Sequence, residues 1–240
     1  MKRIIFLFFL ALVPAFGGRT FNGTSDFIDI VPAGSELSSA AEYTIALRFK
    51  VNTNKDNRPF ARWDDGGSFQ WLIAGGTDGT WNVYMHEPNF NNFRTRALGT
   101  ISTGTWHGLV IRMIDNSGTP LLDAWIDGVK QGGGDSNAFS TSPGGDNMKM
   151  RIGAGNNGTS VSGGFDGDIA ECGFWRGSRL SDAECAMVSK GRSPLRVHVS
   201  ALTGYWPLIG RKSTEVSPRL GSVSGTITGT TRAPHPRVLQ

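Results

Sequence analysis

Residues 165–191 read FDGDIAECGFWRGSRLSDAECAMVSKG, and this stretch decides the fold class. Its first part, 165–175, has the pattern of a strand with apolar residues on both faces. Strict alternation places Phe165, Ile169 and Gly173 on one face and Ala170, Cys172 and Phe174 on the other. After a turn at 176–179, Ser181 and Glu184 have the spacing of a capping box, which predicts one helix of about two turns that ends before Gly191. We therefore expect a strand covered on both faces, followed by the only helix of the chain.

The remaining sequence predicts strands and turns. Residues 42–51, EYTIALRFKV, alternate between apolar and polar side chains, as expected for a strand with one face in a core and the other face in solvent. Segments 68–74 and 80–86 flank a glycine-rich turn, and Asp127-Gly128 is typical of a type I′ hairpin turn. The 33 glycines and the 10% aromatic content suit turns and strands. The pattern predicts one all-β domain, an antiparallel β-sandwich with a short helix after its closing strand.

Six segments, in this order, resemble the laminin-G-like, concanavalin A-like lectin/glucanase jelly-roll domains. They are FNGTSDFIDI, EYTIALRFKV, TWHGLVIRMI, LLDAWIDGVKQ, MRIGAG and FDGDIAECGFWRGSRLSDAEC, and together they cover about 20–192. The later SPLRVHVSALTGYWPLIG is similar to an extension found on such domains in phage-encoded and environmental proteins. The resemblance implies a jelly roll, but its members include lectins, glycoside hydrolases, adhesion modules and virion surface proteins, so it does not decide the function.

We divide the chain into a signal-like apolar segment (1–18), the sandwich (19–209) and a C-terminal extension (210–240). The first segment has a positive start, an apolar run too short for a comfortable membrane span, and small residues at Ala15 and Gly17 that fit a cleavage site. Export follows from this interpretation. The alternative is that the segment is retained and buried in a larger assembly.

The charge of the chain gives little support to nucleic-acid binding. The formal net charge is +4, and Lys2 and Arg3 lie in the signal-like segment. The other basic residues are scattered, with no basic run between aromatic residues.

The two cysteines, Cys172 and Cys185, lie on the closing strand and on the following helix. In an oxidising compartment we expect a disulfide that joins helix to strand. The alternative is two buried thiols, which behave as ordinary core residues.

Catalytic residues are not expected. Retaining glycosidases need two carboxylates about 5–5.5 Å apart, and the glucanases of the resembled family carry a Glu-x-Asp-x-x-Glu run that this chain lacks. The nearest candidates are Asp166, Asp168 and Glu171, which we interpret as part of a turn and of a solvated face. An endo-β-glucanase is therefore the least favoured function.

Cofactors are not expected either, except that calcium is an open alternative. The four histidines are too far apart for a structural zinc site. Calcium takes oxygen ligands from loops, and Asp64, Asp65 and Asp78 lie in glycine-rich loops. Turn formation explains these aspartates equally well.

Candidate ligand-binding residues cluster between positions 63 and 94. A pyranose has an apolar face and a rim of hydroxyl groups, so sugar sites combine aromatic rings with amides and charged groups. The candidates are Trp63, Trp71, Trp81, Tyr84, His86, Asn92 and Arg94. The alternative for the tryptophans, Trp71 and Trp81 in particular, is the core of the sandwich.

These observations predict a non-catalytic, lectin-like surface-binding or adhesion domain that recognises a glycan or a cell-surface partner. We expect it outside the cell or on a phage particle, with affinity gained by multivalency. The alternative is a structural virion protein, a capsid decoration or fibre protein, that clamps neighbouring subunits. A homo-oligomer or a larger assembly is compatible with both.

Overall fold

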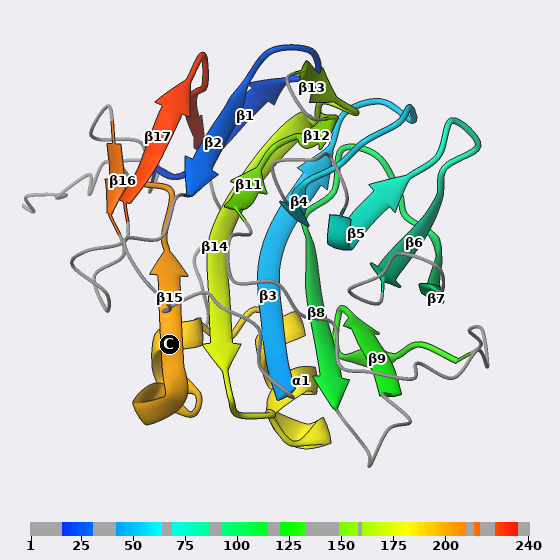
Figure 1. Ribbon diagram of the computed structural model, residues 1–240, viewed down its shortest axis with the longest axis vertical. Coiled ribbons are helices and arrows are strands. Elements are labelled where there is room, and N and C mark those ends of the chain that lie inside the picture. The colour runs from blue at the N-terminus through cyan, green and yellow to red at the C-terminus, as the bar shows by residue number, and fades with distance from the viewer. Residues whose placement is uncertain are drawn as a thin grey trace, which may run out of the picture.

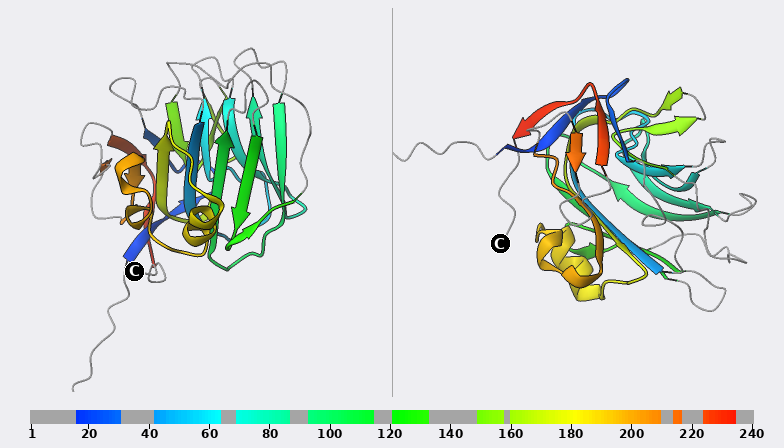
Figure 2. Two further views of the ribbon diagram at one scale, coloured as in Figure 1. Left: turned by 90° about the horizontal axis from the view of Figure 1, so that it is seen from below. Right: turned by 60° about the vertical axis from the view of Figure 1, so that its left-hand side comes forward.

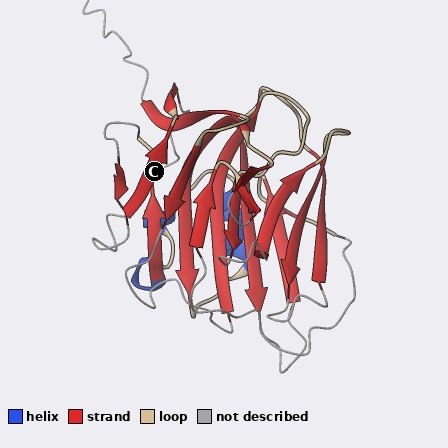
Figure 3. Cartoon of the chain, turned by 45° about the horizontal axis from the view of Figure 1, so that its top comes forward, coloured by secondary structure: helices blue, strands red, loops and turns tan. Residues whose placement is uncertain are grey.

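Two antiparallel sheets pack face to face in the computed structural model (Figures 1 and 3). The structure describes residues 16–30, 42–63, 69–86, 93–114, 121–132, 149–157, 160–209, 214–216 and 224–234. Within these ranges the fold is the antiparallel β-sandwich that the sequence predicts, with one α-helix.

Sheet A contains the closing strand. Its order is β10-β9-β8-β3-β14-β1-β18, and β15 also pairs with β14. The strands are β1 (Phe16–Asn22), β3 (Glu42–Val51), β8 (His107–Ile114), β9 (Leu121–Ile126), β10 (Val129–Lys130), β14 (Asp166–Arg176), β15 (Leu202–Trp206) and β18 (Thr231–Pro234).

Sheet B has the order β16-β17-β2-β11-β4-β5-β6-β7. Its strands are β2 (Phe27–Ile30), β4 (Phe60–Trp63), β5 (Phe69–Gly75), β6 (Thr80–His86), β7 (Phe93–Thr100), β11 (Lys149–Ile152), β16 (Thr214–Val216) and β17 (Ser224–Thr228). A separate hairpin joins β12 (Gly155–Asn157) to β13 (Ser160–Ser162).

The core lies between the sheets and confirms the core face expected for residues 42–51. The solvent face expected for this strand is wrong, because Thr44 and Ala46 are also buried, Ala46 in the second apolar cluster on the outer side of sheet A. Every second side chain of β3 enters the core, namely Tyr43, Ile45, Leu47, Phe49 and Val51. Each such side chain contributes about 1.5–3 kcal/mol relative to an exposed one.

A β-bulge in β14 corrects the prediction for residues 165–175. Ala170 pairs with Arg48 and Gly173 with Ala46, so Glu171 and Cys172 together lie opposite one residue of β3. Glu171 has a φ of 53°. The extra residue reverses the alternation, and Cys172 and Phe174 therefore join Ile169 in the sandwich core instead of facing away from it.

The helix forms as predicted. In α1 (Asp182–Ser189), Ser181 accepts from the Glu184 amide, and the Glu184 carboxylate accepts from the Ser181 amide, which completes the capping box. Two short 3₁₀ helices, η2 (Pro194–Arg196) and η3 (Val199–Ala201), follow it. Figure 2 shows these helical segments on the outer side of sheet A, and a second apolar cluster that includes Trp125, Trp175 and Cys185 lies there.

The expected Cys172–Cys185 disulfide is wrong. Cys172 belongs to the core between the sheets, and Cys185 belongs to the cluster under α1. Neither cysteine forms a disulfide, and both are buried. Because the bulge turns Cys172 into the sandwich core, sheet A separates the two thiols.

Both ends of the described chain belong to the sheets. β1 begins at Phe16, so its first three residues come from the signal-like segment, of which 1–15 lie outside the described residues. β18 pairs with β1 in sheet A, and β17 pairs with β2 in sheet B. Strands from 210–240 thus extend both sheets.

Helix α1 approaches sheet A closely at Gly108 of β8. A Cβ atom on Gly108 would lie 2.1 Å from the backbone oxygen of Ser189, the last residue of α1. Because Gly108 has no side chain, the end of α1 can lie directly against the backbone of β8.

We predict that Gly108→Ala destabilises the domain by about 1–3 kcal/mol, because the helix must shift to admit the methyl group. Urea unfolding measures this change. Gly132→Ala is the matched control, since a Cβ there meets nothing within 4 Å. Equal stability of the two variants would contradict the close helix contact.

Candidate functional site

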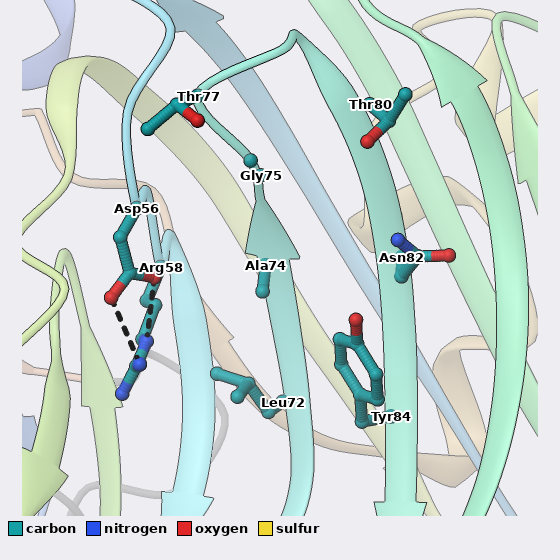
Figure 4. Close-up of a pocket in the computed structure, with 10 residues that line it drawn as sticks. Asp56, Arg58, Leu72, Ala74, Gly75, Thr77, Thr80, Asn82 and Tyr84 are labelled. Atoms are coloured by element: carbon teal, nitrogen blue, oxygen red, sulfur yellow. Dashed lines mark hydrogen bonds and ion pairs between the residues drawn. The ribbon is translucent and has the colours of Figure 1, made fainter.

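The candidate site is a pocket on the outer face of sheet B, between β5, β6 and the loop before β4. Its volume is about 490 Å³, within the range of small-molecule sites. It is lined by Asp56, Arg58, Leu72, Ala74, Gly75, Gly76, Thr77, Thr80, Asn82 and Tyr84. Figure 4 shows Asp56 and Arg58 on one side of it and Asn82 and Tyr84 on the other.

Alternation along β5 and β6 builds this pocket. Trp71 and Trp81 are 0% and 1% exposed and lie in the sandwich core. Residues one position away face outward, because successive side chains of a strand point to opposite faces. Leu72 and Ala74 give the pocket an apolar floor, whereas Asn82 and Tyr84 add polar groups.

The turn between β5 and β6 closes one end of the pocket. Gly75 pairs with Trp81, and a Cβ on Gly75 would lie 2.5 Å from the Trp81 indole, so the core ring requires glycine here. Asp78 accepts from the amide and the hydroxyl of Thr80. These hydrogen bonds lower the pKa of the Asp78 carboxyl and fix the turn that carries Thr77 and Thr80.

Of the predicted ligand-binding residues, Tyr84 alone is among the described residues that line the pocket. Trp71 and Trp81 do not, and their assignment as ligand-binding residues is corrected to core residues. Trp63, His86 and Arg94 lie in β4, β6 and β7, but their side chains, like all of Asn92, fall outside the described residues.

Of the three predicted calcium ligands, only Asp78 lies among the described residues. Asp64 and Asp65 lie outside the described ranges, and Asp78 is engaged by Thr80. Among the residues that the structure describes, no group of three or more His, Cys, Asp or Glu side chains could hold a metal ion.

Sequence reasoning missed most of the pocket lining. Asp56 and Arg58 stand in a polar loop whose packing against sheet B the sequence does not indicate. Asn82 shares its strand face with Tyr84, as alternation with the core residue Trp81 indicates.

Comparison with known proteins identifies the family. The Laminin_G_3 family, described as the concanavalin A-like lectin/glucanases superfamily, matches residues 22–186. The chain belongs to this superfamily. No curated protein matches the chain in sequence.

Solved structures share the concanavalin A-like fold at low sequence identity. A putative carbohydrate binding protein from Bacteroides ovatus ATCC 8483 has a TM-score of 0.67 and 15% identity, over 95% of this chain and 62% of that protein. A heptameric SAP-like pentraxin from Limulus polyphemus has a TM-score of 0.58 and 14% identity, over 77% and 86%. The CBM40 of a Ruminococcus gnavus IT-sialidase, bound to α2,3-sialyllactose, has a TM-score of 0.54 and 12% identity, over 72% and 96%. At these identities the likeness concerns the fold alone.

In this concanavalin A-like sandwich, each of the three acidic candidates for glycosidase chemistry interacts with a different set of side chains. Asp166 accepts from Asn52 and Thr53 at the rim. Asp168 is buried and pairs with Lys50 at 2.5 Å.

Glu171, at the bulge, accepts from the Tyr205 hydroxyl at 2.7 Å and from Ser193 at 3.2 Å. Burial raises the pKa of its carboxyl. Among the described residues that line its small pocket, Glu171 is the only carboxylate. This arrangement lacks the second carboxylate that glycoside hydrolysis requires.

The side chains of Ser102, His107 and Asp127 contact one another in the order of a Ser-His-Asp catalytic triad. We interpret this hydrogen-bonded group, called the clasp below, as a structural link between two loops. Nδ1 of His107 lies 2.7 Å from Asp127 Oδ2. Nε2 lies 2.9 Å from the Ser102 hydroxyl and 3.2 Å from the Ser102 carbonyl oxygen. Carboxylate and carbonyl oxygens only accept, so a protonated imidazole can donate from both ring nitrogens, whereas a neutral one donates from a single nitrogen.

The clasp joins the loop before β8 to the β9–β10 turn. Asp127 also accepts from the Gly108 amide at 2.8 Å, and Arg48 of β3 adds a further positive charge near this carboxylate. The hydrogen bond to Asp127 raises the pKa of His107. Stability from this protonation is fully present below the unfolded pKa of about 6.5 and is lost as pH rises through the raised folded pKa.

We predict that His107→Gln lowers the urea midpoint more at pH 5.5 than at pH 8.5, because the lost ion pair matters only while the imidazole is protonated. Ser102→Ala is the control and keeps most of the wild-type pH dependence, since the backbone acceptor remains. A midpoint difference between wild type and His107→Gln that does not vary with pH would contradict the protonated clasp.

Proposed function

We propose that this domain is a non-catalytic, lectin-like module that binds a glycan in the pocket on sheet B. One observation carries the proposal: an apolar floor of Leu72 and Ala74 lies between the polar groups of Asn82 and Tyr84 and those of Asp56 and Arg58. A sugar ring presents the matching surfaces, an apolar face and a hydroxyl rim. The carbohydrate-binding proteins that share the fold support the same ligand class.

The separate engagement of Asp166, Asp168 and Glu171 supports binding without hydrolysis. We infer a role outside the cell, on a cell surface or a phage particle, and the signal-like residues 1–18 support the export that the first of these needs. Among the described residues, no helix is long and apolar enough to cross a membrane.

We predict that Tyr84→Ala and Asn82→Ala each weaken glycan binding about tenfold. Each substitution removes polar contacts to the sugar, and Tyr84→Ala also removes ring surface. The expected loss of binding free energy is about 1–1.5 kcal/mol for each variant. A glycan array identifies a bound oligosaccharide, and titration calorimetry then measures the affinity of each variant for it.

Thr226→Ala is the matched control, because Thr226 is exposed on β17 of the same sheet and does not line the pocket. It should bind as wild type does. Unchanged affinity of both pocket variants, with unchanged thermal stability, would place the glycan elsewhere. Release of reducing ends from β-glucans would contradict the non-catalytic role.

A further inference from the structure

An ion pair forms one side of the glycan pocket. Arg58 donates from Nε to Asp56 Oδ1 at 3.0 Å and from Nη2 to Asp56 Oδ2 at 2.9 Å. Its third contact is from Nη1 to the Ser162 hydroxyl of β13 at 2.7 Å. Figure 4 shows the two side chains joined in this way at the edge of the pocket. The guanidinium is therefore held in place from two directions.

The pair adds no net charge to the described lining of the pocket. Arg58 and Asp56 are the only charged residues among the described residues that line it. An arginine recognises a carboxylate best through two parallel N–H groups. In Arg58 one such edge is already used, because Nε and Nη2 both donate to Asp56. A carboxylate of an acidic sugar would meet Asp56, a group of the same charge.

Asp56 retains the capacity to bind hydroxyl groups. Its side chain is 57% exposed, and each carboxylate oxygen has a second acceptor site. Hydroxyl groups of a neutral sugar can donate there. Since Arg58 and Ser162 fix the acceptor before the ligand arrives, little conformational freedom is lost on binding.

We infer that Asp56 is the residue that sets the specificity of this pocket, selecting neutral sugars and excluding acidic ones. The inference rests on the proposed function and names the ligand class of the same site. Asp56 acts in two ways: it accepts from neutral hydroxyl groups, and it neutralises Arg58, the one guanidinium among the described residues that line the pocket.

The test compares oligosaccharides that share a neutral core. An array carries neutral oligosaccharides, lactose among them, each beside a sialylated or uronic-acid-bearing form such as α2,3-sialyllactose. The full chain is compared with Asp56→Asn and with the double variant Asp56→Asn/Arg58→Gln. Thermal melting shows that each variant is folded.

Wild type should favour the neutral member of a bound pair by about tenfold or more. Asp56→Asn frees the Arg58 charge, so it should lose affinity for the neutral member and gain about tenfold for the acidic one. This gain should shrink at high salt, and it should be absent in Asp56→Asn/Arg58→Gln, where no charge remains.

Preference of the wild type for the acidic member, or an Asp56→Asn variant with unchanged selectivity, would overturn this inference while glycan binding stands. Retention of no glycan at all by the folded wild type would overturn the proposed function itself, and the inference with it.

Discussion

The bulge in β14 is the constraint on which most of sheet A depends. With strict alternation, Glu171 would follow Ile169 into the core between the sheets. The extra residue opposite Leu47 prevents this, because it reverses the alternation at this point. Cys172 and Phe174 then fill the sandwich core. One strand thereby serves two cores, since Trp175 packs in the cluster under α1.

The same reversal gives Glu171 its partners. Its carboxylate meets Tyr205 of β15 and Ser193 before η2, on the side of sheet A that carries the helices. A buried carboxylate is costly without hydrogen bonds, so these contacts make the bulge and the segment after α1 depend on each other. The residue that resembles a catalytic acid in the sequence is used to connect the closing strand to the chain that follows it.

The proposed binding surface on sheet B arises from the opposite case, uninterrupted alternation along 71–75 of β5 and 81–85 of β6. Trp71 and Trp81 anchor β5 and β6 in the core, and their neighbours Leu72 and Asn82 necessarily face outward. The loop before β4 then adds the Asp56–Arg58 pair. The core and the pocket thus use alternate residues of the same strands, so the large aromatic rings stabilise the pocket without lining it.

The sequence by itself determined the fold class, the sandwich strands with one core face, and the helix with its capping box. These features depend on local pattern: period-two alternation in 42–51, turn residues at Asp127-Gly128, and the spacing of Ser181 and Glu184. Such signals are contained within a few residues, and tertiary contacts here reinforce them.

Only the tertiary structure decided which residues meet. One inserted residue at the bulge reversed the predicted faces and separated Cys172 from Cys185, and no local pattern marks it. The pocket brings Asp56 and Arg58 beside Asn82 and Tyr84 across some two dozen residues of chain. Sequence spacing carries no information about such contacts, because loop packing and strand register place the residues side by side.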